Sequence, residues 1–339
     1  MLISEFDFEL PRDRIAQYPK EKRDESKLMI LHFKTGKIEH RMFKDIVEHL
    51  NKDHILVINN TKVVKARLFC NREDTGGKVE FLLTGIVDDK TFIALANPAR
   101  KAKVHLRFRC GNGSVEVIEY IPKKRVLKIL SKEDVLTFLE KYGSVPLPPY
   151  IKRKATEKDE LWYQTVYAKR KGSIAAPTAG LHFTPHILNK LKEKGVNVFE
   201  ITLHVGLGTF KPIKTEKVEE HTMDVEYYEI EEDIAEKIKN AKKSGKSIIG
   251  VGTTTTRTLE SWSFDNKRLR GYTDLFIYPG YKYKVIDGLL TNFHLPKSTP
   301  LLLVSALCGK DLLKKAYNEA IKRNYRFFSY GDAMLLLND

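Results

Sequence analysis

The sequence predicts an α/β fold: a larger α/β sheet domain into which a small β-barrel domain is inserted. Before residue 62 and again after residue 150, apolar runs of strand length alternate with segments of helical spacing, which is typical of a largely parallel sheet. Between these regions, short apolar runs alternate with turn residues, which is typical of a small barrel. A chain of 339 residues is long enough for two domains. We expect domain limits at 1–62, 63–149 and 150–339, the middle segment being the insertion.

The expected elements follow from periodicity and turn residues. In the first part we predict strands at 28–33, 38–43 and 55–58, and a helix at 44–50 with one apolar face. In the insertion we predict strands at 79–83, 92–95, 104–108, 115–118 and 126–129, and then a helix at 133–142. In the last part, Thr184 and Pro185 start a helix that Gly195 ends, and strands at 196–205 and 247–250 enclose a helix at 234–243.

Composition narrows the class of protein. Lys and Arg number 59 against 44 Asp and Glu, a formal charge of +15, which favours a polyanionic partner. Three separated cysteines argue against a disulfide framework and a cysteine-rich zinc site, so we expect reduced, buried thiols. Acidic residues stand near the N-terminus where a signal peptide has basic ones, and the run 301–308 is too short to span a bilayer. We therefore expect a cytoplasmic protein without membrane contact.

Two glycine-bearing polar segments are candidates for chemistry. Residues 177–184 lead into a helix N-terminus, which favours an anion; Thr178, Gly180 and His182 are its candidates, although Thr184 has a capping role. Residues 202–210 end a predicted strand, where ligands bind in open α/β sheets. Its candidates are Gly206, Gly208, Thr209 and His204, but the histidine also fits a core position and the glycines also fit a turn.

Two further segments carry polar side chains beyond what a turn needs. In residues 250–260, hydroxyl groups and a guanidinium follow a strand, as carboxylate binding requires; the candidates are Thr253, Thr254, Thr255, Arg257 and Glu260. In residues 287–299, Asp287 could accept hydrogen bonds from a ribose diol. If the stretch is extended, Asn292 and His294 lie on the same face. The candidates here are Asp287, Thr291, Asn292 and His294. We predict no metal, because no histidine pair has metal-ligand helical spacing and no carboxylate cluster accompanies these residues.

Basic side chains gather in two regions and suit a nucleic-acid backbone. In the insertion these are Arg100, Lys101, Lys103, Arg107, Arg109, Lys123 and Lys124. After it, Arg153, Arg170 and Lys171 flank Trp162, Tyr163 and Tyr167, and aromatic rings near cations suit splayed bases. A solvated basic face is an equally good interpretation of any one of these residues.

Five segments together resemble the S-adenosylmethionine:tRNA ribosyltransferase-isomerases of queuosine biosynthesis. They are PTAGLHFT (177–184), HVGLGTF (204–210), GTTTTRTLES (252–261), LTNFHLPKS (290–298) and YRFFSYGDAM (325–334). The likeness extends from residue 7 to residue 334. It departs at Lys65, where a proline is expected, which puts only a local turn in doubt.

The resemblance implies an α/β domain carrying a small β-barrel, and a transfer reaction. The ribosyl part of S-adenosylmethionine would move to an aminomethyl-deazaguanine in the tRNA anticodon and rearrange to an epoxycyclopentane, with release of adenine and methionine. S-adenosylmethionine is then a co-substrate, and no cofactor is expected. We expect the partners to be tRNA and S-adenosylmethionine and the chain to be a monomer.

The chemistry assigns hypothetical roles to the residues. A neutral imidazole suits removal of the proton beside the sulfonium, and His182, His204 and His294 are the candidates. We favour His182, because a helix N-terminus disfavours its charged form. Arg257 or a threonine hydroxyl would hold the methionine carboxylate, and a carboxylate would stabilise the ring charge left when adenine departs.

Two other classes of protein stay open at the level of sequence. A non-catalytic RNA-binding protein explains the basic residues but leaves the polar segments unexplained. A hydrolase would need a serine or threonine nucleophile. Ser173, Ser298 and Ser305 lie near the histidine-bearing segments in sequence, but no nucleophile elbow is present.

Overall fold

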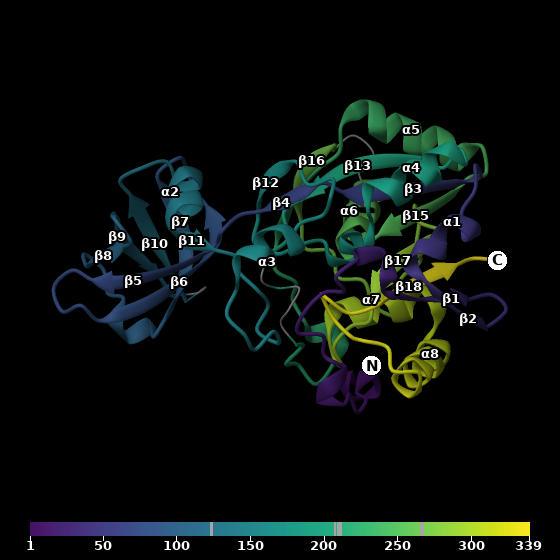
Figure 1. Cartoon of the computed structure of the whole chain (residues 1–339), viewed down its shortest axis with the longest axis horizontal. Coiled ribbons are helices and arrows are strands. Elements are labelled where there is room, and N and C mark those ends of the chain that lie inside the picture. Colours follow the sequence, from purple (N-terminus) through teal and green to yellow (C-terminus); the bar gives the residue numbers. More distant parts are fainter. Residues whose placement is uncertain (123–124, 207, 209–211, 265–267) are drawn as a thin grey trace.

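A computed structural model of the chain describes residues 1–339 except 123–124, 207, 209–211 and 265–267. It forms two bodies: a small β-rich body on the left in Figure 1, and a larger body of strands and helices on the right. The first and last parts of the chain build the larger body, and the middle part builds the smaller one. The predicted α/β fold with an inserted small β-barrel is confirmed.

A nine-stranded sheet forms the centre of the larger body. Its order is β16 (Arg270–Thr273), β14 (Glu226–Glu229), β13 (Asn197–Leu203), β3 (His54–Asn59), β15 (Ser247–Val251), β17 (Gly288–Asn292), β18 (Ala333–Leu337), β1 (Lys27–His32) and β2 (Lys37–Met42). The pairs from β13 to β17 are parallel, as is the pair of β1 and β18. The other pairs are antiparallel. The sheet is therefore mixed, because short turns such as the one between β1 and β2 can join only antiparallel strands.

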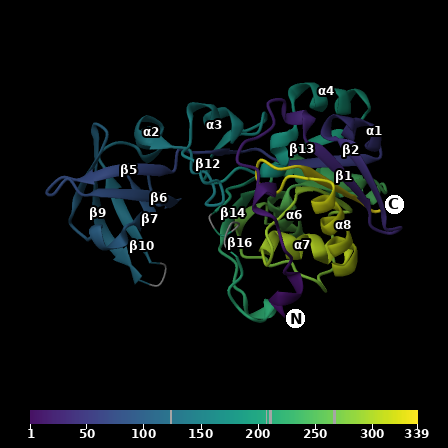
Figure 2. The same ribbon diagram turned by 60° about the horizontal axis from the view of Figure 1, so that its bottom comes forward.

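Helices cover both faces of this sheet (Figure 2). One layer holds α1 (Ile46–His49) and α4 (Pro185–Glu193); the other holds α5 (Glu232–Lys243), α6 (Thr253–Phe264), α7 (Thr299–Cys308) and α8 (Lys310–Lys322). Successive residues of β3 pack alternately against the two helix layers. Ile55 and Val57 pack in the core with α5 to α8, whereas Leu56 and Ile58 pack with α1 and α4. Burial on both faces explains why this strand is apolar at every position from 55 to 58.

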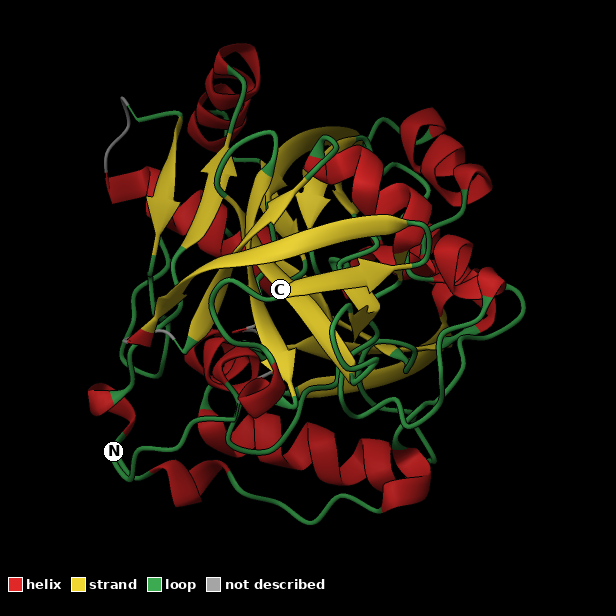
Figure 3. Ribbon diagram, turned by 90° about the vertical axis from the view of Figure 1, so that its left-hand side faces the viewer, coloured by secondary structure: helices red, strands yellow, loops and turns green. Residues whose placement is uncertain are grey.

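The smaller body is a barrel, which lies in front of the nine-stranded sheet in Figure 3. Its strands are β5 (Arg67–Arg72), β6 (Lys78–Ile86), β7 (Thr91–Asn97), β10 (Val126–Ser131), β9 (Gly113–Ile121) and β8 (Arg107–Cys110), and β8 pairs back with β5. The short β11 (Gly143–Ser144) pairs with β5, and α2 (Val135–Tyr142) packs against the barrel. The predicted strand 104–108 begins only at Arg107, because His105 has a positive φ of 67° and interrupts extended backbone.

A disulfide joins Cys70 and Cys110 where the barrel closes. The expectation that all three cysteines are reduced is therefore wrong for these two. They are 40 residues apart in sequence, and only the pairing of β5 with β8 brings them together. Cys308 is free and half-buried, and burial raises the pKa of its thiol to about 12.

Lys65 lies at the junction of the two bodies. Its Nζ atom is 3.4 Å from Glu140 on α2 and 2.9 Å from Glu160 on α3 (Glu157–Trp162). The lysine that stands where a proline is expected thus contacts acids of both bodies. Beside it, β4 (Thr61–Val63) pairs with β12 (Arg170–Ser173). The exact domain limits at 62/63 and 149/150 stay a prediction. Within the described ranges, no helix is long and apolar enough to cross a bilayer.

Candidate active site

Polar segments meet at one edge of the nine-stranded sheet. Because β13, β3, β15 and β17 are adjacent and parallel, their carboxyl ends lie at the same edge, where open α/β sheets bind ligands. A cavity of about 600 Å³, counting its opening to solvent, lies there. The predicted site residues that line it are Thr178, Thr253, Thr254, Thr291, Asn292 and His294. Side chains from all four polar segments therefore line one cavity, since Val205 of residues 202–210 also lines it.

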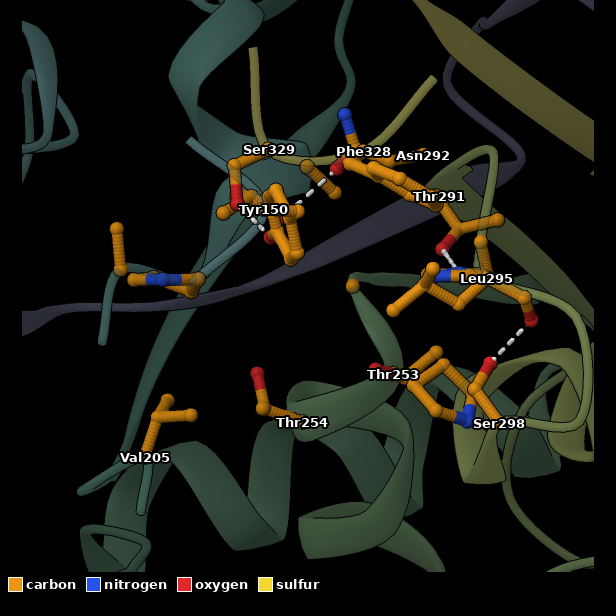
Figure 4. A pocket seen from close by; sticks show the side chains of 17 residues that line it. Tyr150, Val205, Thr253, Thr254, Thr291, Asn292, Leu295, Ser298, Phe328 and Ser329 are labelled. Carbon is orange, nitrogen blue, oxygen red and sulfur yellow. Dashed lines mark hydrogen bonds between the residues drawn. The ribbon is translucent and has the colours of Figure 1, made fainter. Parts of the chain in front are cut away.

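Hydroxyl groups line opposite sides of this cavity (Figure 4). Thr253 and Thr254 belong to the first turn of α6, and Tyr150, Phe328 and Ser329 lie across from them. Tyr150 Oη is 2.6 Å from Ser329 Oγ, and burial raises the pKa of the phenol, so it stays a neutral hydrogen-bonding group. The cavity thus offers several uncharged polar groups to a ligand.

A chain of hydrogen bonds leads from the cavity into the protein through Asn292. Thr178 Oγ1 donates to Asn292 Oδ1 over 2.9 Å, and Asn292 Nδ2 lies 3.1 Å from His182 Nε2. On the other side of the ring, His182 Nδ1 is 2.7 Å from Ser26 Oγ. Since the amide nitrogen donates, Nε2 accepts, and the ring proton then sits on Nδ1 and is donated to Ser26.

His182 itself lies behind the cavity wall. It ends the short helix η7 (Thr178–His182), is buried, and lines a smaller neighbouring pocket instead. Burial, with contributions from Arg326 and Arg23, lowers the pKa of its imidazole to about 3. The ring is therefore neutral, as a base must be, but both of its nitrogens already have partners. Its assignment as the base stays a prediction.

His294 is the predicted histidine that lines the cavity directly. Its Nε2 atom is 2.7 Å from Thr291 Oγ1, and burial lowers the pKa of the imidazole to about 3. Among the described residues, none is hydrogen-bonded to its Nδ1 atom. His204 is outside the lining: its Nδ1 is 2.8 Å from Thr61 Oγ1, and its ring stacks on Tyr227.

Arg257 and Glu226 form a buried ion pair beside the cavity. The guanidinium also donates from Nε to the Leu275 carbonyl over 3.0 Å. The other carboxylate oxygen of Glu226 accepts from the backbone N–H of Gly206 over 2.7 Å. Arg257 borders a smaller apolar pocket that shares Thr253 and Thr254 with the cavity. The guanidinium is thus already neutralised by a carboxylate that sequence reasoning missed.

The remaining glycine and threonine candidates have structural contacts. A Cβ at Gly180 would lie 2.0 Å from Tyr167 Oη, so close packing requires this glycine. At Gly208 a Cβ would lie 2.6 Å from an Asp224 oxygen. Thr255 is buried and donates to the Val251 carbonyl over 2.7 Å, away from the cavity lining. Thr209 lies outside the described residues.

Two predicted carboxylates are not brought to the cavity. Glu260 is fully buried and accepts from Tyr281 Oη and from the backbone N–H groups of residues 284–286. Asp287 precedes β17, at the opposite edge of the sheet, where it pairs with Lys242 over 2.6 Å and accepts from the Ile248 N–H. Both acids satisfy backbone donors that would otherwise be unpaired.

The basic residues predicted to bind tRNA form two groups, one on the barrel and one nearer the cavity. Arg100 and Lys101 on η5 (Ala99–Lys101), Lys103, and Arg107 and Arg109 on β8 belong to the barrel, whose β8 and β9 lie on the side away from the larger body in Figure 1. Arg107 pairs with Glu116 over 3.0 Å. Lys123 and Lys124 lie outside the described residues.

Nearer the cavity, the three other basic candidates differ in accessibility. Arg153 is held by both oxygens of Asp159, at 2.7 Å each, and stacks on Tyr18. Arg170 is exposed and pairs with Glu231 over 2.9 Å, and Lys171 is exposed. Arg153 therefore has a structural role, whereas Arg170 and Lys171 face solvent.

Sequence reasoning missed several residues that shape the site. Tyr150 follows a proline-rich connection, and Phe328 and Ser329 belong to the segment 325–334, which pointed to the family but not to a position in the cavity. No local pattern marks Glu226, because its role depends on β14 lying beside β13. Within the described ranges, no group of three or more His, Cys, Asp and Glu side chains is arranged to hold a metal.

The fold and cavity define an α/β protein with a cavity at the carboxyl edge of its sheet and an added β-barrel. Residues 3–336 match the family model described as queuosine biosynthesis protein, and the chain belongs to this family. A relative from Clostridioides difficile is 50% identical over 99% of this chain and 100% of its own length, and one from Clostridium kluyveri is 52% identical with the same coverage. Both are named S-adenosylmethionine:tRNA ribosyltransferase-isomerase.

A solved structure is also similar. The crystal structure of S-adenosylmethionine tRNA ribosyltransferase from Thermotoga maritima is 37% identical, with a TM-score of 0.57. The match covers 98% of this chain and 100% of that one. Both parts of the chain are therefore included in the likeness.

Proposed function

We propose that this chain is an S-adenosylmethionine:tRNA ribosyltransferase-isomerase. It would transfer the ribosyl part of S-adenosylmethionine to the aminomethyl-deazaguanine of a tRNA anticodon and produce epoxyqueuosine-tRNA. A C–N bond forms between the neutral amine and a carbon of the ribosyl part, which loses the proton beside the sulfonium and closes to the epoxycyclopentane. The C–S bond breaks with its electron pair going to methionine, and the bond from the sugar to adenine breaks with its pair going to adenine, which gains a proton. Membership of the family and relatives with this name at about half identity over full length support the proposal.

The cavity at the carboxyl edge is the proposed site for S-adenosylmethionine. The convergence of residues 177–179, 252–254 and 291–298 on one space is the observation that carries this assignment. Thr253 and Thr254 stand at the N-terminus of α6, where free N–H groups favour a carboxylate. Since Arg257 already pairs with Glu226, the threonines are the better partners for the methionine carboxylate.

The base in this site must be neutral and able to reach the ligand. His294 and His182 both have a pKa lowered by burial to about 3, so both rings are uncharged at neutral pH. Only the first of these two lines the cavity. The position of His294 in the cavity lining supports this residue as the base. The hydrogen bond between His182 and the Asn292 amide supports a role for His182 in orienting Asn292.

Release of adenine tests the proposed function. The purified chain is incubated with S-adenosylmethionine and tRNA carrying the aminomethyl-deazaguanine, and adenine and the tRNA mass are measured. We expect stoichiometric adenine and a heavier tRNA, and neither product with tRNA that lacks the aminomethyl group. Binding of tRNA without adenine release would instead identify a non-catalytic RNA-binding protein.

A further inference from the structure

A second pocket lies directly behind the wall of the cavity. Thr178 and Ala179 line the cavity, whereas Leu181 and His182 line the second pocket, so the segment 178–182 separates the two. Ser329 lines both. The second pocket measures about 290 Å³, counting its opening to solvent. The hydrogen-bonded chain from Thr178 through Asn292 and His182 to Ser26 connects them.

The wall of the second pocket is strongly basic. Lys20, Arg23 and Arg326 line it, and Lys20 is exposed and has no ion pair with any described residue. Arg326 donates to the Tyr18 carbonyl over 3.2 Å, while its buried Nε atom has no hydrogen-bond partner in the described part of the chain. The pocket therefore carries excess positive charge and favours an anion.

The carboxylate of Asp332 lies close to these cations, and both of its oxygens already accept hydrogen bonds from backbone N–H groups. Asp332 Oδ1 is 3.5 Å from Arg326 Nη2 and accepts from the Lys27 N–H, and its Oδ2 accepts from the Arg326 N–H. Burial, and then the positive charges of Arg326 and Arg23, lower the pKa of His182, which lines the same pocket. Asp332 thus offsets one of three positive charges.

Aromatic rings stand at the mouth of the same pocket. Trp162 lines it and is half-buried, and Tyr18, which is 53% exposed, packs edge-to-face against Trp162 with ring centroids 6.5 Å apart. Lys158 Nζ lies 5.7 Å from the Trp162 ring centre. Aromatic rings among cations are the combination that binds single-stranded nucleic acid, with bases stacked on the rings and phosphates held by the cations.

We propose that the second pocket binds a nucleotide of the tRNA that neighbours the nucleotide being modified. Lys20 and Arg326 would hold its phosphate and Trp162 would stack on its base. This inference rests on the proposed function, which supplies tRNA as the polyanion and the anticodon loop as a source of unstacked bases. The shared wall at residues 178–182 places the two nucleotides next to each other.

A fluorescent purine analogue in an anticodon stem-loop RNA tests this assignment. The analogue replaces the nucleotide on one side of the modified position or on the other, and its quenching is followed during titration with the full-length protein. We expect quenching at one of the two positions, and its loss in Trp162→Ala. Affinity for the stem-loop should fall about 5- to 150-fold in that variant, the range measured for loss of one base–aromatic stack.

Lys20→Ala tests the phosphate contact separately, because the exposed Lys20 side chain can be removed without loss of core packing. It should weaken binding and reduce the slope of log affinity against log salt by about 1. Two matched controls should bind like the wild type: Lys22→Ala, an exposed lysine paired with Glu25, and Tyr272→Ala, an aromatic residue that is 74% exposed on β16. S-adenosylmethionine affinity should be unchanged in Trp162→Ala, Lys20→Ala and both controls, and thermal midpoints should be unchanged in the three variants of exposed residues.

Wild-type affinity and quenching in both Trp162→Ala and Lys20→Ala would overturn the second-pocket assignment. If Trp162→Ala lowers the thermal midpoint, Trp162→Phe, which keeps a stacking surface, should restore both midpoint and quenching. Failure of the proposed function would look different, because wild-type protein would then release no adenine with any tRNA. The pocket assignment fails on its own if adenine release is normal but neither variant changes RNA binding.

Discussion

Glu226 bridges Arg257 of helix α6 and the backbone of Gly206, the first described glycine after strand β13. The pair is buried, and it joins two of the polar segments that sequence reasoning treated as separate ligand contacts. Its position beside Thr253 and Thr254 indicates that it fixes the geometry of the cavity wall.

Removing Arg257 should therefore destabilise the protein. Arg257→Ala leaves the buried Glu226 carboxylate unpaired, which typically costs about 3–5 kcal/mol of unfolding free energy. Chemical denaturation measures this loss. We also expect weaker S-adenosylmethionine binding, because the cavity wall shifts.

The double variant Arg257→Met/Glu226→Leu separates a packing role from ligand binding. Replacing both charges with apolar groups should recover most of the stability. If S-adenosylmethionine affinity, measured by calorimetry, also recovers, Arg257 acts through the fold. A stable double variant that still fails to bind S-adenosylmethionine would assign Arg257 to the methionine carboxylate.

The two buried histidines should respond differently to replacement. His294→Ala should keep S-adenosylmethionine binding and lose turnover by about 10²–10⁴-fold, the usual worth of a general base. His182→Ala leaves the Asn292 amide without its partner and should cost about 1–3 kcal/mol of stability. Single-turnover rates and thermal midpoints are the measurements. A folded, inactive His182→Ala beside an active His294→Ala would instead make His182 the base.

Stability should fall as the solution becomes acidic. His182 and His294 stay neutral in the folded state because burial lowers each pKa to about 3 from an ordinary 6.5. Between these values the unfolded chain binds more protons than the folded one, so acid favours unfolding. Each histidine contributes a slope of about 1.4 kcal/mol per pH unit. Denaturation midpoints measured in this window should rise with pH, and His294→Gln should flatten the dependence; equal slopes in both proteins would contradict burial of a neutral His294.

The sequence predicts an element correctly where its local pattern is compatible with only one kind of secondary structure. The run at 55–58 is apolar at every position because helices cover both faces of the sheet, and β3 lies there as predicted. The capped helix after Thr184 forms as predicted, with the Thr184 hydroxyl accepting from the Ile187 N–H. The Cys70–Cys110 disulfide could not be predicted, because it depends on which strands close the barrel.

Some residues of the candidate site were likewise predictable from local segments, and others were not. Segments that follow parallel strands could be placed at one edge, and Thr253, Asn292 and His294 do line one cavity. The two acids in those segments were not predicted correctly. Glu260 and Asp287 could contact a ligand chemically, but each accepts hydrogen bonds from backbone N–H groups instead. Glu226 lies outside every motif and reaches the site only through tertiary packing.

Basic residues of the barrel should contribute to tRNA binding through their charge. Replacing Arg107, Arg109, Lys123 and Lys124 together should weaken tRNA affinity and reduce its salt dependence while leaving S-adenosylmethionine binding unchanged. Filter-binding titrations at several salt concentrations measure both quantities. A control that replaces the exposed lysines 314–315 of α8 should bind tRNA normally. Wild-type affinity in the fourfold variant would remove the barrel from the interface.

The fate of two isotopic labels tests the central claim most directly. S-adenosylmethionine labelled in the ribose with one isotope and in the methionine methyl group with another is incubated with enzyme and tRNA bearing the aminomethyl-deazaguanine, and the tRNA is then isolated. We predict that the ribose label enters the tRNA in a one-to-one ratio with released adenine, while the methyl label stays with free methionine. Methyl label in the tRNA, or ribose label only in small molecules, would contradict a ribosyl transfer.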